Sequence, residues 1–254
     1  MRHAGFFLAL ATIVACSGPT SRATTTTPAA TPSPTIATLT PTPATPSPTP
    51  TPSPGAIVRY VAIGASDTVG VGAADPTSGS WPARVARLLP PGGAYVSVGV
   101  SGSTASQARA QQLPSAVAQR PTVVSLWLAV NDINAQVTPQ AYASDLGAIV
   151  DGLVTGTQAK IFVGNVPDLR PVPAYAQADK NALFALIVAY NDTIAQVAAR
   201  TPERVVVVDL FTGSAPLVSE MTVSSDGFHP SDAGYQLIAD RFSAAMKRGG
   251  VPLR

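Results

Sequence analysis

Five short segments of almost continuously apolar residues constrain the fold of this chain more than any other feature. They lie at residues 57–63, 95–100, 123–130, 160–166 and 204–210. Strands that are apolar at nearly every position, rather than at every second one, are typical of parallel sheets covered on both faces. Longer segments with helical spacing separate them. This alternation predicts a three-layer α/β/α sandwich with a five-stranded parallel sheet.

The intervening segments carry the start and stop signals of helices. Thr138 is a predicted N-cap with Pro139 as the first helical residue, and apolar residues follow at spacings of three and four. A second helix is predicted after Asp179 and should stop before Thr201, which precedes a proline. The last helix is predicted to begin at Ser231.

The N-terminus has the pattern of an export signal. Residues 1–3 are positively charged, and residues 4–15 form an apolar run that is too short to cross a bilayer, which takes about 20 residues. The run ends at Cys16 and resembles a bacterial lipobox. That resemblance implies a signal peptide at residues 1–15, cleavage after Ala15 and lipidation of Cys16. The alternative is an ordinary secretory signal in which Cys16 is incidental.

Residues 16–54 have a different composition from the rest of the chain. They consist almost entirely of Thr, Pro, Ser and Ala, so they offer too little apolar surface to offset the entropy of folding. Frequent proline favours an extended chain. We interpret this segment as a tether, or as a spacer of no specific length, and predict a globular domain at residues 55–254. The expected location is the cell envelope, with the protein lipid-anchored to the membrane on its extracytoplasmic side.

The charge balance gives no indication of a strongly charged partner. Charged residues make up 12% of the chain and the net charge is +2, with no basic stretch that would suggest nucleic acid. The single cysteine excludes an internal disulfide framework. We expect a monomer whose partners are its substrate and, through the lipid anchor, the membrane.

A lone imidazole points to the chemistry. The chain has two histidines, and His3 lies in the predicted signal peptide, which leaves His229 in the mature protein. Asp226 precedes it by three residues, which suits a catalytic base and its orienting carboxylate. The candidate nucleophile, Ser66, follows the first predicted strand.

Other polar residues follow the predicted strands in the same way. Gly102, Asn131 and Asn165 lie at the ends of the second, third and fourth strands. Ligands of open α/β sheets bind beyond the carboxyl ends of the strands, so these residues should converge on one rim together with the 225–229 loop.

Four sequence blocks along residues 60–242 resemble those of the SGNH hydrolases, the GDSL-type esterase/lipase superfamily. The blocks read Gly-Ala-Ser at 64–66, Val-Ser-Gly-Ser at 100–103, Ala-Val-Asn-Asp at 129–132 and Asp-Gly-Phe-His-Pro at 226–230. The resemblance implies a flavodoxin-like fold. It also implies a Ser66-His229-Asp226 triad and an oxyanion hole formed by Ser66, Gly102 and Asn131. Two departures stand out, because Ala65 replaces the usual Asp and Ala129 the usual Gly.

The chemistry of these residues is consistent with ester hydrolysis. A hydroxyl attacks a carbonyl poorly unless a base takes its proton, which His229 can do while Asp226 fixes its tautomer. The backbone N–H groups of Ser66 and Gly102 and the Asn131 amide would stabilise the oxyanion. This mechanism requires no cofactor and no metal.

Three functions remain open at this stage. The preferred one is a serine esterase acting on short acyl or acetyl esters, possibly of extracellular glycans, with a lysophospholipase or thioesterase as an alternative within the same family. A metal-dependent phosphoesterase would use Asp67, Asn131, Asp132 and His229, but one imidazole is too few for the usual ligand sets. A catalytically silent wall-binding lipoprotein is the third.

Several residues also have purely structural interpretations. We expect Asp67 and Asp132 to be local hydrogen-bonding partners, Trp81 to pack in the core, and Asn191 to lie on a solvated helix face.

The domain contains no large insertion that would suggest a lid or a long acyl tunnel.

Overall fold

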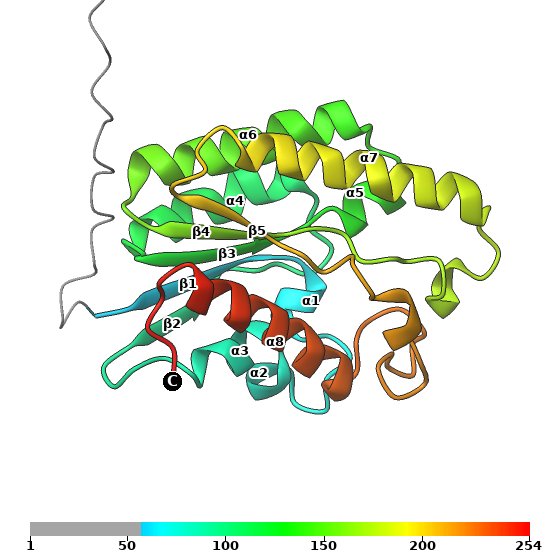
Figure 1. Cartoon of the computed structure of the whole chain (residues 1–254), viewed down its shortest axis with the longest axis horizontal. Helices are drawn as coiled ribbons and strands as arrows, with labels where there is room; N and C mark the ends of the chain where they lie inside the picture. The colour runs from blue at the N-terminus through cyan, green and yellow to red at the C-terminus, as the bar shows by residue number, and fades with distance from the viewer. Residues whose placement is uncertain (1–56) are drawn as a thin grey trace, which may run out of the picture. The chain divides into compact units, whose positions relative to one another are not determined.

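A computed structural model describes residues 57–254 (Figure 1). The predicted signal peptide at residues 1–15, the lipidation site Cys16 and the tether at residues 16–54 lie outside the described residues, as does the predicted start of the domain at residue 55. Within the described part, no helix combines the length and the apolar composition needed to cross a membrane.

The sheet confirms the predicted architecture. Five strands pair in parallel in the order β2-β1-β3-β4-β5. Their bounds are β1 Arg59–Gly64, β2 Ala94–Ser97, β3 Val123–Trp127, β4 Lys160–Gly164 and β5 Val205–Val208. Because β1 and β3 are adjacent parallel strands, the loops that follow them are neighbours at the carboxyl ends of the strands.

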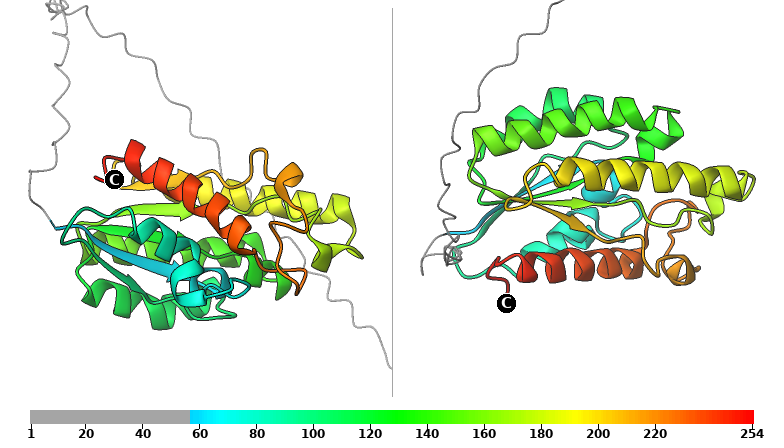
Figure 2. Two further views of the ribbon diagram at one scale, coloured as in Figure 1. Left: turned by 90° about the horizontal axis from the view of Figure 1, so that it is seen from below. Right: turned by 45° about the horizontal axis from the view of Figure 1, so that its top comes forward.

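Helices cover both faces of this sheet (Figures 1 and 2). One face carries α4 (Ala105–Ala118), α6 (Pro139–Gly156) and α7 (Lys180–Ala198), and the other carries α3 (Trp81–Ala86) and α8 (Asp232–Arg248). The short elements are α1 (Ser66–Val69), α2 (Pro76–Gly79), α5 (Val130–Asn134) and the 3-10 turns η1 (Pro173–Tyr175) and η2 (Ala215–Leu217).

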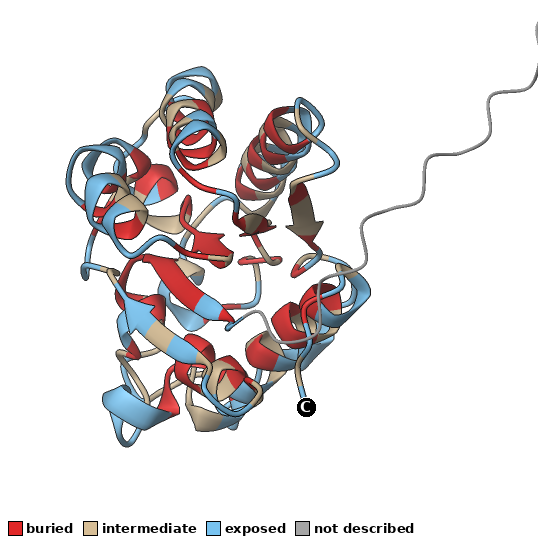
Figure 3. Ribbon diagram, turned by 90° about the vertical axis from the view of Figure 1, so that its left-hand side faces the viewer, coloured by how far each residue is buried: buried red, intermediate tan, exposed pale blue. Residues whose placement is uncertain are grey.

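The continuous apolar strands are explained by two cores. Successive strand residues point to opposite faces, so Val61 and Ile63 pack with α4, α6 and α7, whereas Tyr60 and Ala62 pack with α3 and α8. Buried residues accordingly lie on both sides of the sheet (Figure 3). Trp81 is fully buried and stacks on Phe242, as expected for a core residue.

The second strand forms as predicted, but the prediction that both of its faces are buried is wrong. Coverage on both faces was expected, but Ala94, Val96 and Ser97 of β2 are exposed. The reason is its position at the edge of the sheet, where it has a neighbour on one side only. Apolar composition alone did not distinguish this edge strand from a central one.

The predicted helix starts are confirmed. The Thr138 hydroxyl accepts a hydrogen bond from the N–H of Ala141, and the Asp179 carboxylate caps α7. Ser231 caps α8. The interpretation of Asn191 as solvated is wrong, because its side-chain amide bonds both the N–H and the carbonyl of Val166. It holds the segment after β4 against α7.

Candidate active site

The residues singled out in the sequence meet at the carboxyl edge of the sheet. Ser66 is the first residue of α1, directly after β1 and Ala65. Gly102 lies in the loop after β2, and Asn131 lies in α5, which follows β3. Asp226 and His229 lie in the loop that enters α8. Parallel pairing places all these loops on the same side of the molecule.

Ser66, His229 and Asp226 form a continuous chain of hydrogen bonds. Nε2 of His229 lies 2.9 Å from Oγ of Ser66, and Nδ1 of the same ring lies 2.6 Å from Oδ2 of Asp226. Ser66 is 7% exposed, so its hydroxyl is largely shielded from water. The short Asp226 contact orients the ring with Nε2 toward the serine.

Asp226 is held by its own loop. Its Oδ1 accepts hydrogen bonds from the hydroxyl of Ser224 and from the N–H groups of Phe228 and His229. Partial burial acts to raise the pKa of Asp226, but the hydrogen bonds from His229, Ser224 and the backbone outweigh it and hold that pKa well below its usual range. The carboxylate therefore stays ionised beside the imidazole at neutral pH.

Three N–H groups on this rim, from Ser66, Gly102 and Asn131, are available as hydrogen-bond donors. The N–H of Ser66 is the first in α1 and has no partner within that helix. Gly102 has φ of 78°, which a residue with a side chain rarely adopts, and within residues 57–254 its N–H donates no hydrogen bond. Nδ2 of Asn131 donates to the carbonyl of Ser103, which leaves the second amide hydrogen free to donate.

The two departures from the family blocks have different structural consequences. Ala129 has φ of 94° and ψ of −40°, so this alanine occupies a backbone conformation that favours glycine. This turn ends the strand at Trp127, earlier than the predicted residue 130, and begins α5. Ala65 is buried and precedes α1 without a side-chain cap.

A buried glutamine joins two of the active-site loops. The side chain of Gln112, in α4, accepts from the N–H of Gly64 and donates to the carbonyl of Gly64 and the hydroxyl of Ser103. It therefore connects the residues before the nucleophile with the loop of Gly102. Sequence reasoning missed Gln112, because nothing in the helical pattern of α4 distinguishes it from the neighbouring glutamines.

Asp132 plays a similar part, as expected for a local partner. Both of its carboxylate oxygens accept from the N–H of Ala105, the first residue of α4. Asp132 is 1% exposed, and burial raises its pKa to about 6 despite these bonds. Asn165 is likewise structural: its amide bonds Asp209 and the N–H of Leu210.

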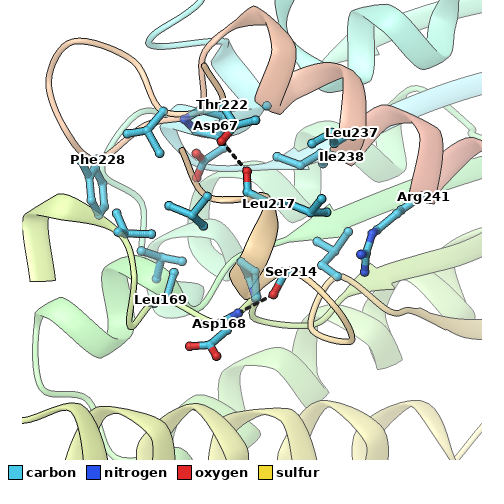
Figure 4. Close-up of a pocket in the computed structure, with 18 of the residues that line it drawn as sticks. Asp67, Asp168, Leu169, Ser214, Leu217, Thr222, Phe228, Leu237, Ile238 and Arg241 are labelled. Carbon is cyan, nitrogen blue, oxygen red and sulfur yellow. Dashed lines mark hydrogen bonds between the residues drawn. The ribbon is translucent and has the colours of Figure 1, made fainter. Parts of the chain in front are cut away.

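A mostly apolar pocket of about 130 Å³ is lined in part by Asp67, the residue after the candidate nucleophile (Figure 4). Much of its wall comes from the segment between β5 and α8, including Leu217 and Val218. A second, smaller cavity contains Ser66 and Asn131. Four residues line both: Asp67, Trp127, Val130 and Phe228. Sequence reasoning did not foresee this pocket, because it expected an enclosing wall to require an insertion.

The metal-dependent alternative lacks a ligand cluster in the part of the chain that the structure describes. No three His, Cys, Asp or Glu side chains group there in a way that could hold an ion. Asp67 and Asp132 point to different environments: Asp132 is tied to α4, whereas Asp67 lines the pocket.

Comparison with known proteins bears on both the fold and the site. The model of the GDSL-like lipase/acylhydrolase family matches residues 62–237. No curated protein matches the chain.

Solved structures with the same fold include two esterases that act on carbohydrates. The crystal structure of TesA is 22% identical, with a TM-score of 0.61, and the match covers 75% of this chain and 99% of that one. Axe2, an acetyl-xylooligosaccharide esterase from Geobacillus stearothermophilus, is 20% identical with a TM-score of 0.60, over 76% of this chain and 94% of that one. A family 3 carbohydrate esterase from Clostridium thermocellum is 22% identical with a TM-score of 0.59, over 76% and 96%.

Proposed function

Since this chain belongs to the GDSL-like lipase/acylhydrolase family, we propose that it is a serine esterase that uses Ser66, His229 and Asp226 as its triad. Family membership makes the protein a carboxylic ester hydrolase. The roles of individual residues and the substrate class are what the proposal adds.

The first half of the reaction forms an acyl-enzyme. Oγ of Ser66 attacks the ester carbonyl carbon while Nε2 of His229 takes its proton, and the ionised Asp226 stabilises the imidazolium. The carbonyl oxygen becomes an oxyanion that accepts hydrogen bonds from Ser66, Gly102 and Asn131. When this intermediate collapses, His229 returns the proton to the leaving alkoxide. Water then repeats the sequence, releasing the acid and regenerating the serine.

The observation that carries this proposal is the unbroken hydrogen-bond chain from Oγ through the imidazole to Oδ2, with contacts of 2.9 and 2.6 Å. Side chains separated by more than 160 positions in the sequence have the geometry that general-base activation of a serine needs. A catalytically silent binding protein would have no use for it.

The pocket supports an acyl group larger than acetyl. A dry apolar cavity of about 150 Å³ accommodates benzene, so about 130 Å³ suits a group of about five or six carbons. We propose short to medium acyl esters as substrates. The alternative is a lysophospholipase or thioesterase, whose longer acyl chain would start on the same apolar wall and extend out of the pocket. Acetyl esters of glycans, the substrate named for Axe2, would leave the pocket largely unfilled.

The test is hydrolysis of p-nitrophenyl acetate, butyrate, hexanoate and octanoate by the purified protein, beside Ser66→Ala and in the presence of a chelator. We expect turnover that is greatest near hexanoate, is lost in the variant and is indifferent to chelation. Equal rates in the variant, or loss of turnover on chelation, would overturn the proposal.

We also propose, from the sequence, that the enzyme is lipid-anchored at Cys16 to the extracytoplasmic side of the membrane. Labelled palmitate should be incorporated into the protein in bacterial cells and should be absent from Cys16→Ser. Incorporation that persists in the variant would contradict the anchor.

A further inference from the structure

Asp67, the residue after the nucleophile, carries a carboxylate that has almost no hydrogen-bonding partner among the described residues. It lines both the apolar pocket and the small cavity that contains Ser66 and Asn131. Apart from its own N–H, no donor among the described residues forms a hydrogen bond with its side chain, and it takes part in no ion pair there. Figure 4 shows this carboxylate among the side chains that enclose the pocket.

Asp67 is half-buried, so its carboxylate is only partly removed from water. This partial burial raises the pKa of Asp67 to about 6, although the nearby imidazole of His229 opposes the change. At pH 7 the group is still mainly ionised. A negative charge therefore faces an apolar space beside the reacting carbonyl.

Among residues 57–254, no lysine or arginine side chain forms an ion pair with this carboxylate. Arg241 also lines the pocket, but its guanidinium donates to the backbone carbonyls of Asp209 and Thr212. His229 must be neutral to act as the base. The remaining source of a positive charge is the substrate.

We propose that Asp67 is a specificity-determining residue that binds an ammonium group carried by the substrate close to its ester carbonyl. The favoured substrates are then esters of apolar amino acids, with the side chain in the pocket and the amine on Asp67. This inference rests on the proposed esterase function and narrows its substrate class.

The acyl side is the better place for the amine. The leaving group departs toward the imidazole that protonates it, and beyond Asp226 lies an open groove lined by Ser224, Ser231 and Asp232. The apolar pocket is lined by Asp67 and Phe228. An acyl group that fills the pocket therefore passes the carboxylate, whereas the alcohol faces the open groove.

The test compares two esters with the same six-carbon acyl chain, the ethyl esters of norleucine and of hexanoic acid, on the full chain at pH 7. The readout is the ratio of their kcat/KM values in the wild type and in Asp67→Asn. The intrinsic reactivities of the two esters are the same for both proteins, so they cancel when the ratios are compared. From the strength of a hydrogen bond to a charged group, we expect this ratio to fall about 10- to 100-fold in the variant. Asp192→Asn, an exposed aspartate of α7, is the matched control and should leave the ratio unchanged.

Several results would overturn the proposal. If both esters slow equally in Asp67→Asn, Asp67 acts through His229 and does not recognise the substrate. If the 2-aminoethyl ester of hexanoic acid, rather than the norleucine ester, shows the Asp67-dependent preference over ethyl hexanoate, the amine lies on the alcohol side and the acyl assignment is wrong.

A binding measurement separates this inference from the esterase proposal. Calorimetry with hexylamine and with hexanol on Ser66→Ala requires no turnover. We expect hexylamine to bind more tightly, and the added Asp67→Asn change to remove that difference. Equal binding of the two ligands overturns the inference even if hydrolysis is observed. Absence of Ser66-dependent hydrolysis of ethyl hexanoate, with the binding preference intact, refutes only the esterase.

Discussion

Replacing Ala129 with glycine should stabilise this protein, although the substitution deletes a fully buried methyl group. Ala129 has φ of 94° and ψ of −40°, outside even the left-handed helical region that non-glycine residues occasionally visit. Such a conformation costs an alanine on the order of 2–3 kcal/mol and a glycine very little.

Two terms oppose this gain. The methyl group of Ala129 is 0% exposed, and its loss costs about 0.8 kcal/mol of apolar burial. Glycine also gains freedom in the unfolded chain, which costs about 0.4–1 kcal/mol. The net expectation for Ala129→Gly is a stabilisation of about 1 kcal/mol, which in a domain of this size raises Tm by about 2–4 °C.

The matched control is Ala108→Gly. Ala108 is equally buried but lies inside α4 in ordinary helical geometry, so glycine there should cost about 1 kcal/mol in helix propensity and a similar amount in burial. Thermal unfolding of both variants, followed by circular dichroism and calorimetry, should move Tm in opposite directions. If Ala129→Gly lowers Tm as far as Ala108→Gly does, the strain argument is refuted.

Three further predictions concern the site. Asn131→Ala should lower kcat by about 10²–10³ with little change in KM, as measured by ester hydrolysis, because an oxyanion donor acts mainly in the transition state. Gln112→Leu should lower kcat by displacing the Gly64 and Ser103 loops, and Gln112→Glu should not restore it, because a carboxylate cannot donate to the Gly64 carbonyl. Burial raises the pKa of Asp132 above its unfolded value, so the folded state binds a proton more tightly than the unfolded chain does. The stability that this proton contributes is fully present below about pH 3.8 and is lost as pH rises through about 6. In denaturant unfolding from pH 4 to 7, the unfolding free energy of Asp132→Asn should therefore rise by up to about 3 kcal/mol relative to that of the wild type.

The parts of the fold that sequence predicted are those encoded locally. Continuous apolar segments indicate buried parallel strands, and a capping residue such as Thr138 marks the start of a helix. The placement of Ser66, Gly102 and Asn131 on one rim followed from the rule that parallel strands end at the same edge. Their distances did not follow, because no sequence pattern fixes how a loop is oriented.

The parts that sequence missed depend on contacts between distant segments. Gln112 resembles any helical glutamine until Gly64 and Ser103 are seen on either side of it. Asn191 looked solvated because a polar residue on a helix usually is, and only the path of the chain after β4 brings Val166 to it. The exposed faces of β2 follow from strand order, which apolar composition does not encode.

The structure divides the site into a part fixed by buried polar contacts and a part formed mainly by apolar packing. Gln112, Asp132 and Asn131 tie the loops after β1, β2 and β3 to one another, so the proposed oxyanion donors lie on loops that are held by hydrogen bonds whose partners are largely buried. By contrast, the part of the pocket wall that comes from the segment between β5 and α8 consists mainly of apolar side chains. Apolar packing tolerates changes of size better than a buried hydrogen bond tolerates loss of a partner. Asp67 lies at the junction of these two parts, so in the role proposed for it a single carboxylate beside Ser66 would determine which substrate is favoured.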